Sequence, residues 1–227
     1  MKSPIIVALD MGPKNALDLA KEIDPQECRV KVGSQLFTIG GPLVIEKLND
    51  LGFDVFLDLK FHDIPNTVRK SVQAAIKMGV WMLNVHSLGG KEMLRAAYET
   101  VENSPIKPLL IGVTILTSLD DKDIKQVGLS KSTSDQVLHL AQLCQNEGLD
   151  GVVCSPKELS ILRERLDKDF LLVSPGIRSI KLKKDDQVRT STATEAVNSG
   201  ANYIVIGREV TDDKNPSKKI HQILKAF

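Results

Sequence analysis

Closely spaced charged residues follow an apolar run at positions 55–57. They read Asp58-Leu59-Lys60-Phe61-His62-Asp63 and continue as Ile64-Pro65-Asn66-Thr67. If the apolar run is a strand, Asp58 and Lys60 point to the same side, because side chains alternate along a strand. A carboxylate and an ammonium are costly to bury unless they are paired or used in chemistry. A simpler alternative is an ion pair beside a helix cap at Asp63, since Pro65 indicates the start of a helix.

The charges around Lys60 favour one kind of chemistry. Carboxylates at Asp58 and Asp63 offset the desolvation of the Lys60 ammonium group, which is therefore expected to stay charged. A charged amine suits a proton donor, or a group that stabilises a developing carbanion, better than a Schiff-base nucleophile. Asp58 would raise the energy of an anionic substrate that loses its charge in the transition state. This combination predicts removal of CO2 from an anionic substrate, followed by protonation by Lys60.

The overall composition narrows the class of protein. The chain has 227 residues, of which 42% are hydrophobic and 26% charged, as is typical of a globular protein with a substantial core. The net charge of +1 creates no global field that would favour nucleic acid or an anionic membrane. No apolar run approaches the roughly 20 residues of a membrane span, and the N-terminus lacks the long apolar region of a signal peptide. We therefore expect a cytoplasmic protein without nucleic-acid or membrane partners.

The number and spacing of the cysteines also favour a cytoplasmic location. Cys28, Cys144 and Cys154 are odd in number and show no CxxC spacing. This pattern argues against a disulfide framework and against a zinc site. We expect core or near-core thiols in a reducing compartment.

Apolar runs rich in Val, Ile and Leu alternate with helical patterns along the chain. The expected strands lie at 5–9, 29–32, 55–59, 82–85, 109–115, 151–154, 170–173 and 203–206, and the expected helices at 15–23, 41–51, 65–78, 90–101, 133–147, 156–166, 192–199 and 216–227. About eight such repeats in this length indicate a closed (β/α)8 TIM barrel. A doubly wound sheet is the alternative, but its glycine-rich loop is missing after the first strand. No linker is evident, so residues 1–227 are expected to form a single α/β domain.

In such a barrel the active site lies at the carboxyl ends of the strands. The polar residues expected there are Asp10, Lys31, Asp58, Lys60, Asn84, His86, Thr114, Thr117, Ser155, Arg178 and Arg208. Charged residues end the first three strands, and those at the second and third could form an array of alternating charge at one mouth of the barrel: Lys31, Asp58, Lys60 and Asp63.

The loops after the last two expected strands could hold a phosphate group, as such loops commonly do in barrels. They contain Pro175-Gly176, Arg178, Gly207 and Arg208, and Arg208 could clamp a phosphate through its planar guanidinium. The alternative is that the glycines are turn residues and Arg208 is a surface charge. The long polar segment from Arg178 to Gln187 is typical of a lid, with Arg178 and Gln187 as its candidate ligand contacts.

Motifs along nearly the whole chain resemble those of the orotidine 5'-phosphate decarboxylase family in its short bacterial form. They are Ala8-Leu9-Asp10, Lys31-Val32-Gly33, the stretch from Asp58 to Thr67, Thr114-Ile115-Leu116-Thr117-Ser118, Pro175-Gly176-Ile177-Arg178, Asp186-Gln187 and Ile206-Gly207-Arg208. The stretch from Asp58 to Thr67 is highly specific, and the weaker motifs fall in the right order. The resemblance implies a homodimeric barrel that needs no cofactor and no metal, with its sites at the subunit interface.

The resemblance also implies a role for each matching residue. Lys60 would donate a proton to C6 of the pyrimidine of orotidine 5'-phosphate, with Asp58 beside the departing carboxylate. Asp10 and Lys31 would bind the ribose hydroxyls, and Asp63 and Thr67 would reach the site of the neighbouring subunit. The remaining contacts would be Thr117 to the base and Arg178, Gln187, Gly207 and Arg208 to the phosphate.

Two positions depart from the family pattern, and two alternative functions are open. Ser179 and Glu209 stand where the family commonly has proline. A metal-dependent relative, such as a ketogulonate phosphate decarboxylase or hexulose phosphate synthase, would carry a carboxylate at the second strand, whereas Lys31 would repel a divalent cation there. A barrel that binds phosphorylated ligands without catalysis would not need to bury Lys60 and Asp58 together.

Overall fold

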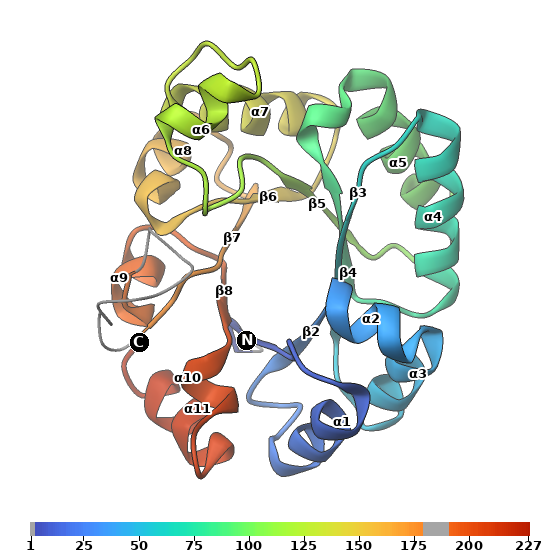
Figure 1. Ribbon diagram of the computed structural model, residues 1–227, viewed down its shortest axis with the longest axis vertical. Coiled ribbons are helices and arrows are strands. Elements are labelled where there is room, and N and C mark those ends of the chain that lie inside the picture. Colours follow the sequence, from blue (N-terminus) through green and yellow to red (C-terminus); the bar gives the residue numbers. More distant parts are fainter. Residues whose placement is uncertain (1–2, 179–190) are drawn as a thin grey trace.

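Parallel strands close into a barrel in the computed structural model, which describes residues 3–178 and 191–227 (Figure 1). The strands of the described chain are β1 (Ile5–Ala8), β2 (Arg29–Gly33), β3 (Val55–Phe61), β4 (Met82–His86), β5 (Leu109–Val113), β6 (Gly151–Val153), β7 (Leu171–Ser174) and β8 (Tyr203–Ile206). Each pairs with its neighbour in chain order, and β8 pairs with β1 to close the ring. The predicted (β/α)8 barrel is confirmed.

Helices surround the strands (Figure 1). They are α1 (Pro13–Glu22), α2 (Ser34–Gly40), α3 (Pro42–Asp50), α4 (Pro65–Lys77), α5 (Lys91–Glu102), α6 (Asp121–Gln126), α7 (Thr133–Asn146), α8 (Leu159–Arg165), α9 (Ala193–Asn198), α10 (Arg208–Thr211) and α11 (Pro216–Leu224), with short 3-10 turns η1 (Ser87–Gly89) and η2 (Pro156–Glu158). Proline at the first turn starts α1, α3, α4 and α11, where its missing N–H has no helical partner to lose. No helix in the described part of the chain is long and apolar enough to cross a membrane.

The barrel interior is filled by apolar side chains. This inner layer consists of Ile6, Ala8, Phe56, Met82, Ile111, Val173 and Val205, all of them buried. A larger apolar cluster lies between the strands and the helices. The inner layer supports the site, because Ala8, Phe56 and Val205 also line the cavity above it. Truncation of Phe56, which is only 1% exposed, would cost about 3–5 kcal/mol of stability.

Aromatic residues close the opposite, amino-terminal end of the barrel. The guanidinium carbon of Arg29 lies 4.4 Å from the ring centroid of Trp81 and 5.2 Å from that of Tyr203. Arg29 also lies 3.3 Å from a carboxylate oxygen of Asp54. Trp81 therefore has a packing role against Arg29 and Tyr203.

The structure differs from the sequence prediction at some element boundaries. The fifth strand ends at Val113 rather than at residue 115. Helices α2, α6 and α10 were not predicted, because each is too short to show a clear hydrophobic period. Only α6 carries a strong local start signal, a capping box formed by Asp120 and Asp123.

Candidate active site

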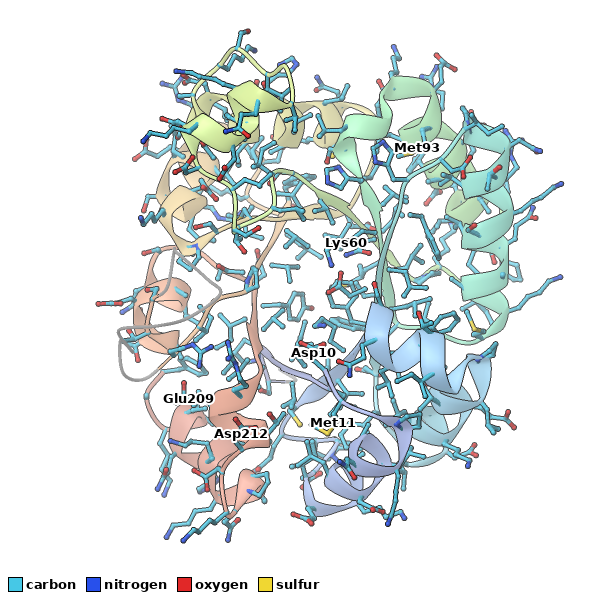
Figure 2. All side chains as sticks on the ribbon, in the orientation of Figure 1. Asp10, Met11, Lys60, Met93, Glu209 and Asp212 are labelled. Atoms are coloured by element: carbon cyan, nitrogen blue, oxygen red, sulfur yellow. The ribbon has the colours of Figure 1, made fainter. Side chains whose placement is uncertain are left out.

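A cavity of about 770 Å³ opens at the carboxyl ends of the strands. Its wall includes Asp10, Lys31, Asp58, Lys60, Thr117, Arg178, Gly207 and Arg208. Lys60 and Asp10 lie at the inner side of the strand ring, while Glu209 and Asp212 come from the α10 segment (Figure 2). Residues that the sequence predicted for the reacting end and for the phosphate end thus face one cavity.

The charged residues of β2 and β3 form a connected chain of ion pairs. Lys31 Nζ lies 2.9 Å from Oδ1 of Asp10 and 3.3 Å from Oδ2 of Asp58. Lys60 Nζ lies 2.6 Å from Oδ1 of Asp58. The Lys31 and Asp58 side chains are 10% and 14% exposed, whereas Lys60 is 37% exposed. Lys60 is therefore the ammonium group that is more open to the cavity.

The pairing keeps the inner groups charged. Burial alone would raise the pKa of Asp58, but the charges of Lys31 and Lys60 outweigh it and lower this pKa below the usual carboxyl value. Burial alone would lower the pKa of Lys31, but the charges of Asp58 and Asp10 raise it above the usual lysine value. Both groups remain ionised at neutral pH.

Gly33, the last residue of β2, leaves room for this chain of ion pairs. A Cβ atom at position 33 would lie 3.0 Å from Lys31 Nζ and 3.1 Å from Asp10 Oδ1. Contacts this short would force one of the two side chains to move. The glycine therefore permits the close approach between Asp10 and Lys31.

Strand β3 departs from regular geometry at Lys60. Leu57 pairs with Leu83 and Phe61 with Val85, so the register shifts between these two pairs. Within the described residues, Lys60 is the one non-glycine residue with a positive φ, at 54°. Such a conformation is uncommon for residues other than glycine and is often found at functional sites.

Asn84 on β4 bridges this irregularity. Its Oδ1 accepts a hydrogen bond of 2.7 Å from the backbone N–H of Lys60, and its Nδ2 donates one of 2.7 Å to Oδ1 of Asp58. The sequence identified Asn84 as a polar residue at a strand end but gave it no role. The one sequence signal was an amide within the otherwise apolar run from Met82 to Val85, which marks the position as unusual without giving its role.

The residues predicted for the phosphate end line the same cavity: Pro175, Gly176, Arg178, Gly207 and Arg208. Gly176 has a φ of 80°, a conformation that glycine adopts readily. The backbone N–H of Arg178 donates to the carbonyl of Ser191, and the N–H of Ser191 donates to the carbonyl of Gly176. Gly207 precedes α10, which begins at Arg208. Gln187 and the predicted lid segment after Arg178 lie outside the described residues.

Asp63 and Thr67 do not line the cavity of their own chain. Both are exposed, Thr67 in the first turn of α4 and Asp63 just before it. Asp63 is not a helix cap: the N-cap residue is Ile64, and the Asp63 carboxylate accepts a 2.7 Å hydrogen bond from the N–H of Ile64. The alternative of a helix cap, raised from Pro65, is therefore wrong.

Two histidine rings stack at the carboxyl ends of β3 and β4. The rings of His62 and His86 are 5.1 Å apart and nearly parallel. Burial, together with the charges of His62 and Lys60, lowers the pKa of His86 to about 4. His86 Nδ1 accepts a hydrogen bond from the N–H of Leu88, as expected for a structural histidine. Among the residues described, no group of three or more His, Cys, Asp or Glu side chains is arranged to hold a metal ion.

Comparisons with known proteins agree with this geometry. The model of the orotidine 5'-phosphate decarboxylase / HUMPS family matches residues 3–223. The chain is 50% identical over 221 residues to the orotidine 5'-phosphate decarboxylase of Hydrogenovibrio crunogenus, covering 96% of this chain and 93% of the relative. It is 50% identical over 223 residues to the enzyme of the same name from Nitrosococcus oceani, covering 98% and 96%.

A solved structure extends the likeness to three dimensions. The crystal structure of orotidine 5'-phosphate decarboxylase from Lactobacillus acidophilus superposes with a TM-score of 0.88 at 36% identity. The superposition covers 99% of this chain and 98% of that structure. With sequence and fold matching over nearly the full length, the chain belongs to the orotidine 5'-phosphate decarboxylase / HUMPS family and is a carboxy-lyase.

Proposed function

We propose that the protein converts orotidine 5'-phosphate to UMP, in pyrimidine biosynthesis, without metal or cofactor. The observation that carries this proposal is the ion-pair chain of Lys31, Asp58 and Lys60 on the wall of the cavity that also contains Arg208. Relatives that are half identical carry the name of this activity, which supports the same assignment.

In the proposed reaction the bond between C6 and the carboxylate carbon breaks, and its electron pair remains on C6. The ammonium group of Lys60 stabilises the developing carbanion and then transfers a proton to C6, while CO2 leaves. Asp58, which stays ionised next to Lys60, would lie beside the substrate carboxylate and disfavour its charge in the ground state.

The other cavity residues would hold the nucleotide. Asp10 and Lys31 would bind the ribose hydroxyls, and Thr117 would contact the base. Arg178, Gly207 and Arg208 would bind the phosphate, together with Gln187. Binding energy from the phosphate could then assist the reaction at the distant base.

We further propose that the active form is a homodimer in which Asp63 and Thr67 complete the site of the partner subunit. Both residues are exposed and lie outside the cavity of their own chain, which supports this role. Large apolar side chains are also exposed after three neighbouring strands: Ile39 and Leu43 after β2, Ile64 after β3 and Leu88 after β4. Apolar surface next to Asp63 is consistent with an interface at this mouth.

Two further assignments are proposals of the same kind. Residues 1–227 act as one domain, and the protein works in the cytoplasm. Cys28, Cys144 and Cys154 are free thiols in the folded chain, which supports a reducing compartment.

The direct test is the loss of ultraviolet absorbance when purified protein is added to orotidine 5'-phosphate in the presence of a chelator. We expect steady loss of substrate absorbance and formation of UMP. The absence of turnover in wild-type protein would overturn the assignment. Turnover that disappears after metal removal and returns with Mg²⁺ would favour the metal-dependent alternative.

A further inference from the structure

Asn84 lies beside a point where the hydrogen-bond ladder between β3 and β4 is interrupted. In a parallel ladder, strand N–H groups bond to carbonyls of the neighbouring strand. Between the pairs Leu57–Leu83 and Phe61–Val85, β3 uses four residue steps where β4 uses two. The backbone N–H of Lys60 falls in this gap and donates instead to the side chain of Asn84.

The orientation of the Asn84 amide follows from this contact. Since the N–H of Lys60 can only donate, the Asn84 atom facing it must be the carbonyl oxygen. The NH2 group then points at Asp58, 2.7 Å away, and can only donate. Asn84 thus favours a carboxylate that accepts, which is the ionised form of Asp58.

Asn84 is fully buried and does not line the cavity. It therefore acts on the reaction only through its neighbours. A buried backbone N–H without a partner is unfavourable, so the hydrogen bond from Lys60 to Asn84 favours this conformation of Lys60, and the hydrogen bond to Asp58 favours this orientation of its carboxylate.

We propose that Asn84 is a positioning residue that holds Lys60 in its left-handed backbone conformation and keeps Asp58 ionised and oriented. Its amide replaces the missing ladder bond on one side and supplies the carboxylate with a neutral donor on the other. The inference rests on the proposed function for its kinetic consequences, because Lys60 and Asp58 are the residues assigned to the reaction.

The sharpest test is Asn84→Asp, which keeps the shape of the side chain. At a pH above the pKa of the new carboxyl group, both carboxylates would be ionised, and their repulsion would displace Asp58 and Lys60. At a pH below this pKa, the two carboxyl groups would share one proton, and the side chain at position 84 could again contact both Lys60 and Asp58. We expect kcat of the variant, relative to wild type, to fall by roughly tenfold or more between about pH 5.5 and about pH 8.5.

The other charged groups near Asn84 are common to wild type and variant. They are Lys31 on β2, Asp10 after β1, Lys60 on β3, His62 after β3 and His86 on β4. The pKa of His86 is lowered to about 4, so its ring stays neutral through the tested range. The ratio of the two pH profiles therefore isolates the carboxylate pair.

Asn202 offers a matched control at the other end of the barrel. Its Oδ1 accepts a 2.8 Å hydrogen bond from the N–H of Leu172, so it also satisfies a strand N–H, but far from the cavity. Asn202→Asp should leave the pH profile of kcat unchanged. Asn84→Ala, which removes both hydrogen bonds, should lower kcat by at least about tenfold across the whole range.

Distinct outcomes separate this inference from the proposed function. If Asn84→Ala lowers thermal stability but leaves kcat within about twofold, or if the Asn84→Asp profile parallels wild type, Asn84 is merely structural and the proposal fails. If wild-type protein itself lacks turnover, the proposed function fails. A crystal structure of Asn84→Ala then tests whether Asn84 sets the conformations of Lys60 and Asp58. Retention of the positive φ at Lys60 and of its short contact with Asp58 would then overturn the proposal.

Discussion

The ammonium nitrogen of Lys60 lies 2.6 Å from Oδ1 of Asp58, although both residues belong to the same strand. The Asp58 carboxylate also pairs with Lys31, whose Nζ lies 3.3 Å from its second oxygen, Oδ2. The ammonium group that we propose as the proton donor is thus held in place by a carboxylate that it shares with Lys31. This relationship leads to the first prediction.

Lys60→Ala should retain nucleotide binding and lose turnover. Removal of the proposed proton donor and of a fixed positive charge should lower kcat by roughly 10³-fold or more, while the affinity for UMP changes little. Steady-state kinetics and calorimetric titration with UMP measure the two effects separately. Unchanged turnover would rule out the proposed mechanism, and loss of UMP binding would indicate a damaged fold.

The lowered pKa of Asp58 predicts how stability depends on pH. A carboxyl group with a depressed folded-state pKa contributes stability above its unfolded value, about 3.9, and loses it as pH falls through the folded value. Asp58→Asn should therefore be less stable than wild type at pH 7, because buried Lys31 loses a neutralising partner. The difference in thermal midpoint should shrink as the pH falls below about 3.9. A constant difference would mean that ionisation of Asp58 does not stabilise the fold.

His86 should make the protein less stable in mild acid. Its folded-state pKa of about 4 lies below the unfolded value of about 6.5, so the unfolded chain binds more protons between these limits. Stability should decline as pH falls from about 6.5 to about 4, and His86→Gln should flatten this decline. His139→Gln, on the exposed face of α7, is the control. Thermal midpoints at several pH values test this, and an identical slope in His86→Gln would contradict it.

Arg208 should matter only for a substrate with a phosphate. Loss of a charge-assisted contact costs about 1.5–3 kcal/mol, so Arg208→Ala should lower kcat/KM for orotidine 5'-phosphate by roughly 10- to 100-fold. The reaction of orotidine, which lacks the phosphate, should hardly change. Arg165→Ala, at the exposed end of α8, serves as a control for loss of positive charge. Equal losses with both substrates would contradict the assignment of Arg208 to the phosphate.

Mixing two inactive variants tests the proposed shared site. If Asp63 serves the partner subunit, a mixed dimer of Lys60→Ala and Asp63→Ala contains one intact site and one doubly defective site. Random subunit exchange should then restore about a quarter of the wild-type activity, because half of the dimers are mixed. Sedimentation confirms that dimers form. No recovery despite verified exchange would contradict a role for Asp63 across the interface.

Much of the architecture was predictable because the strands are strongly apolar and regularly spaced. A strand such as β4, with Met82, Leu83 and Val85 buried, is recognisable from composition alone. The short helices α2 and α10 were not, since a helix of one or two turns carries too little periodicity. Their presence is decided by packing at the barrel rim rather than by local pattern.

Some features of the site could likewise be predicted from the sequence, whereas others could not. Asp58 and Lys60 could be placed together from alternation along a strand, and the structure pairs them. The role of Asn84 could not be predicted, because it depends on a register shift between β3 and β4 that no side-chain pattern encodes. The reach of Asp63 to a second chain likewise cannot be derived from periodicity, and it stays a prediction that rests on resemblance.

The left-handed backbone at Lys60 places opposing demands on one sequence position. On backbone grounds alone, glycine would fit a φ of 54° with less strain than lysine. Backbone strain therefore favours a residue that cannot carry a proton, while the proposed reaction needs the amine. Position 60 is thus a local trade-off between stability and activity, and changes selected only for a more stable barrel would tend to erase the reaction there.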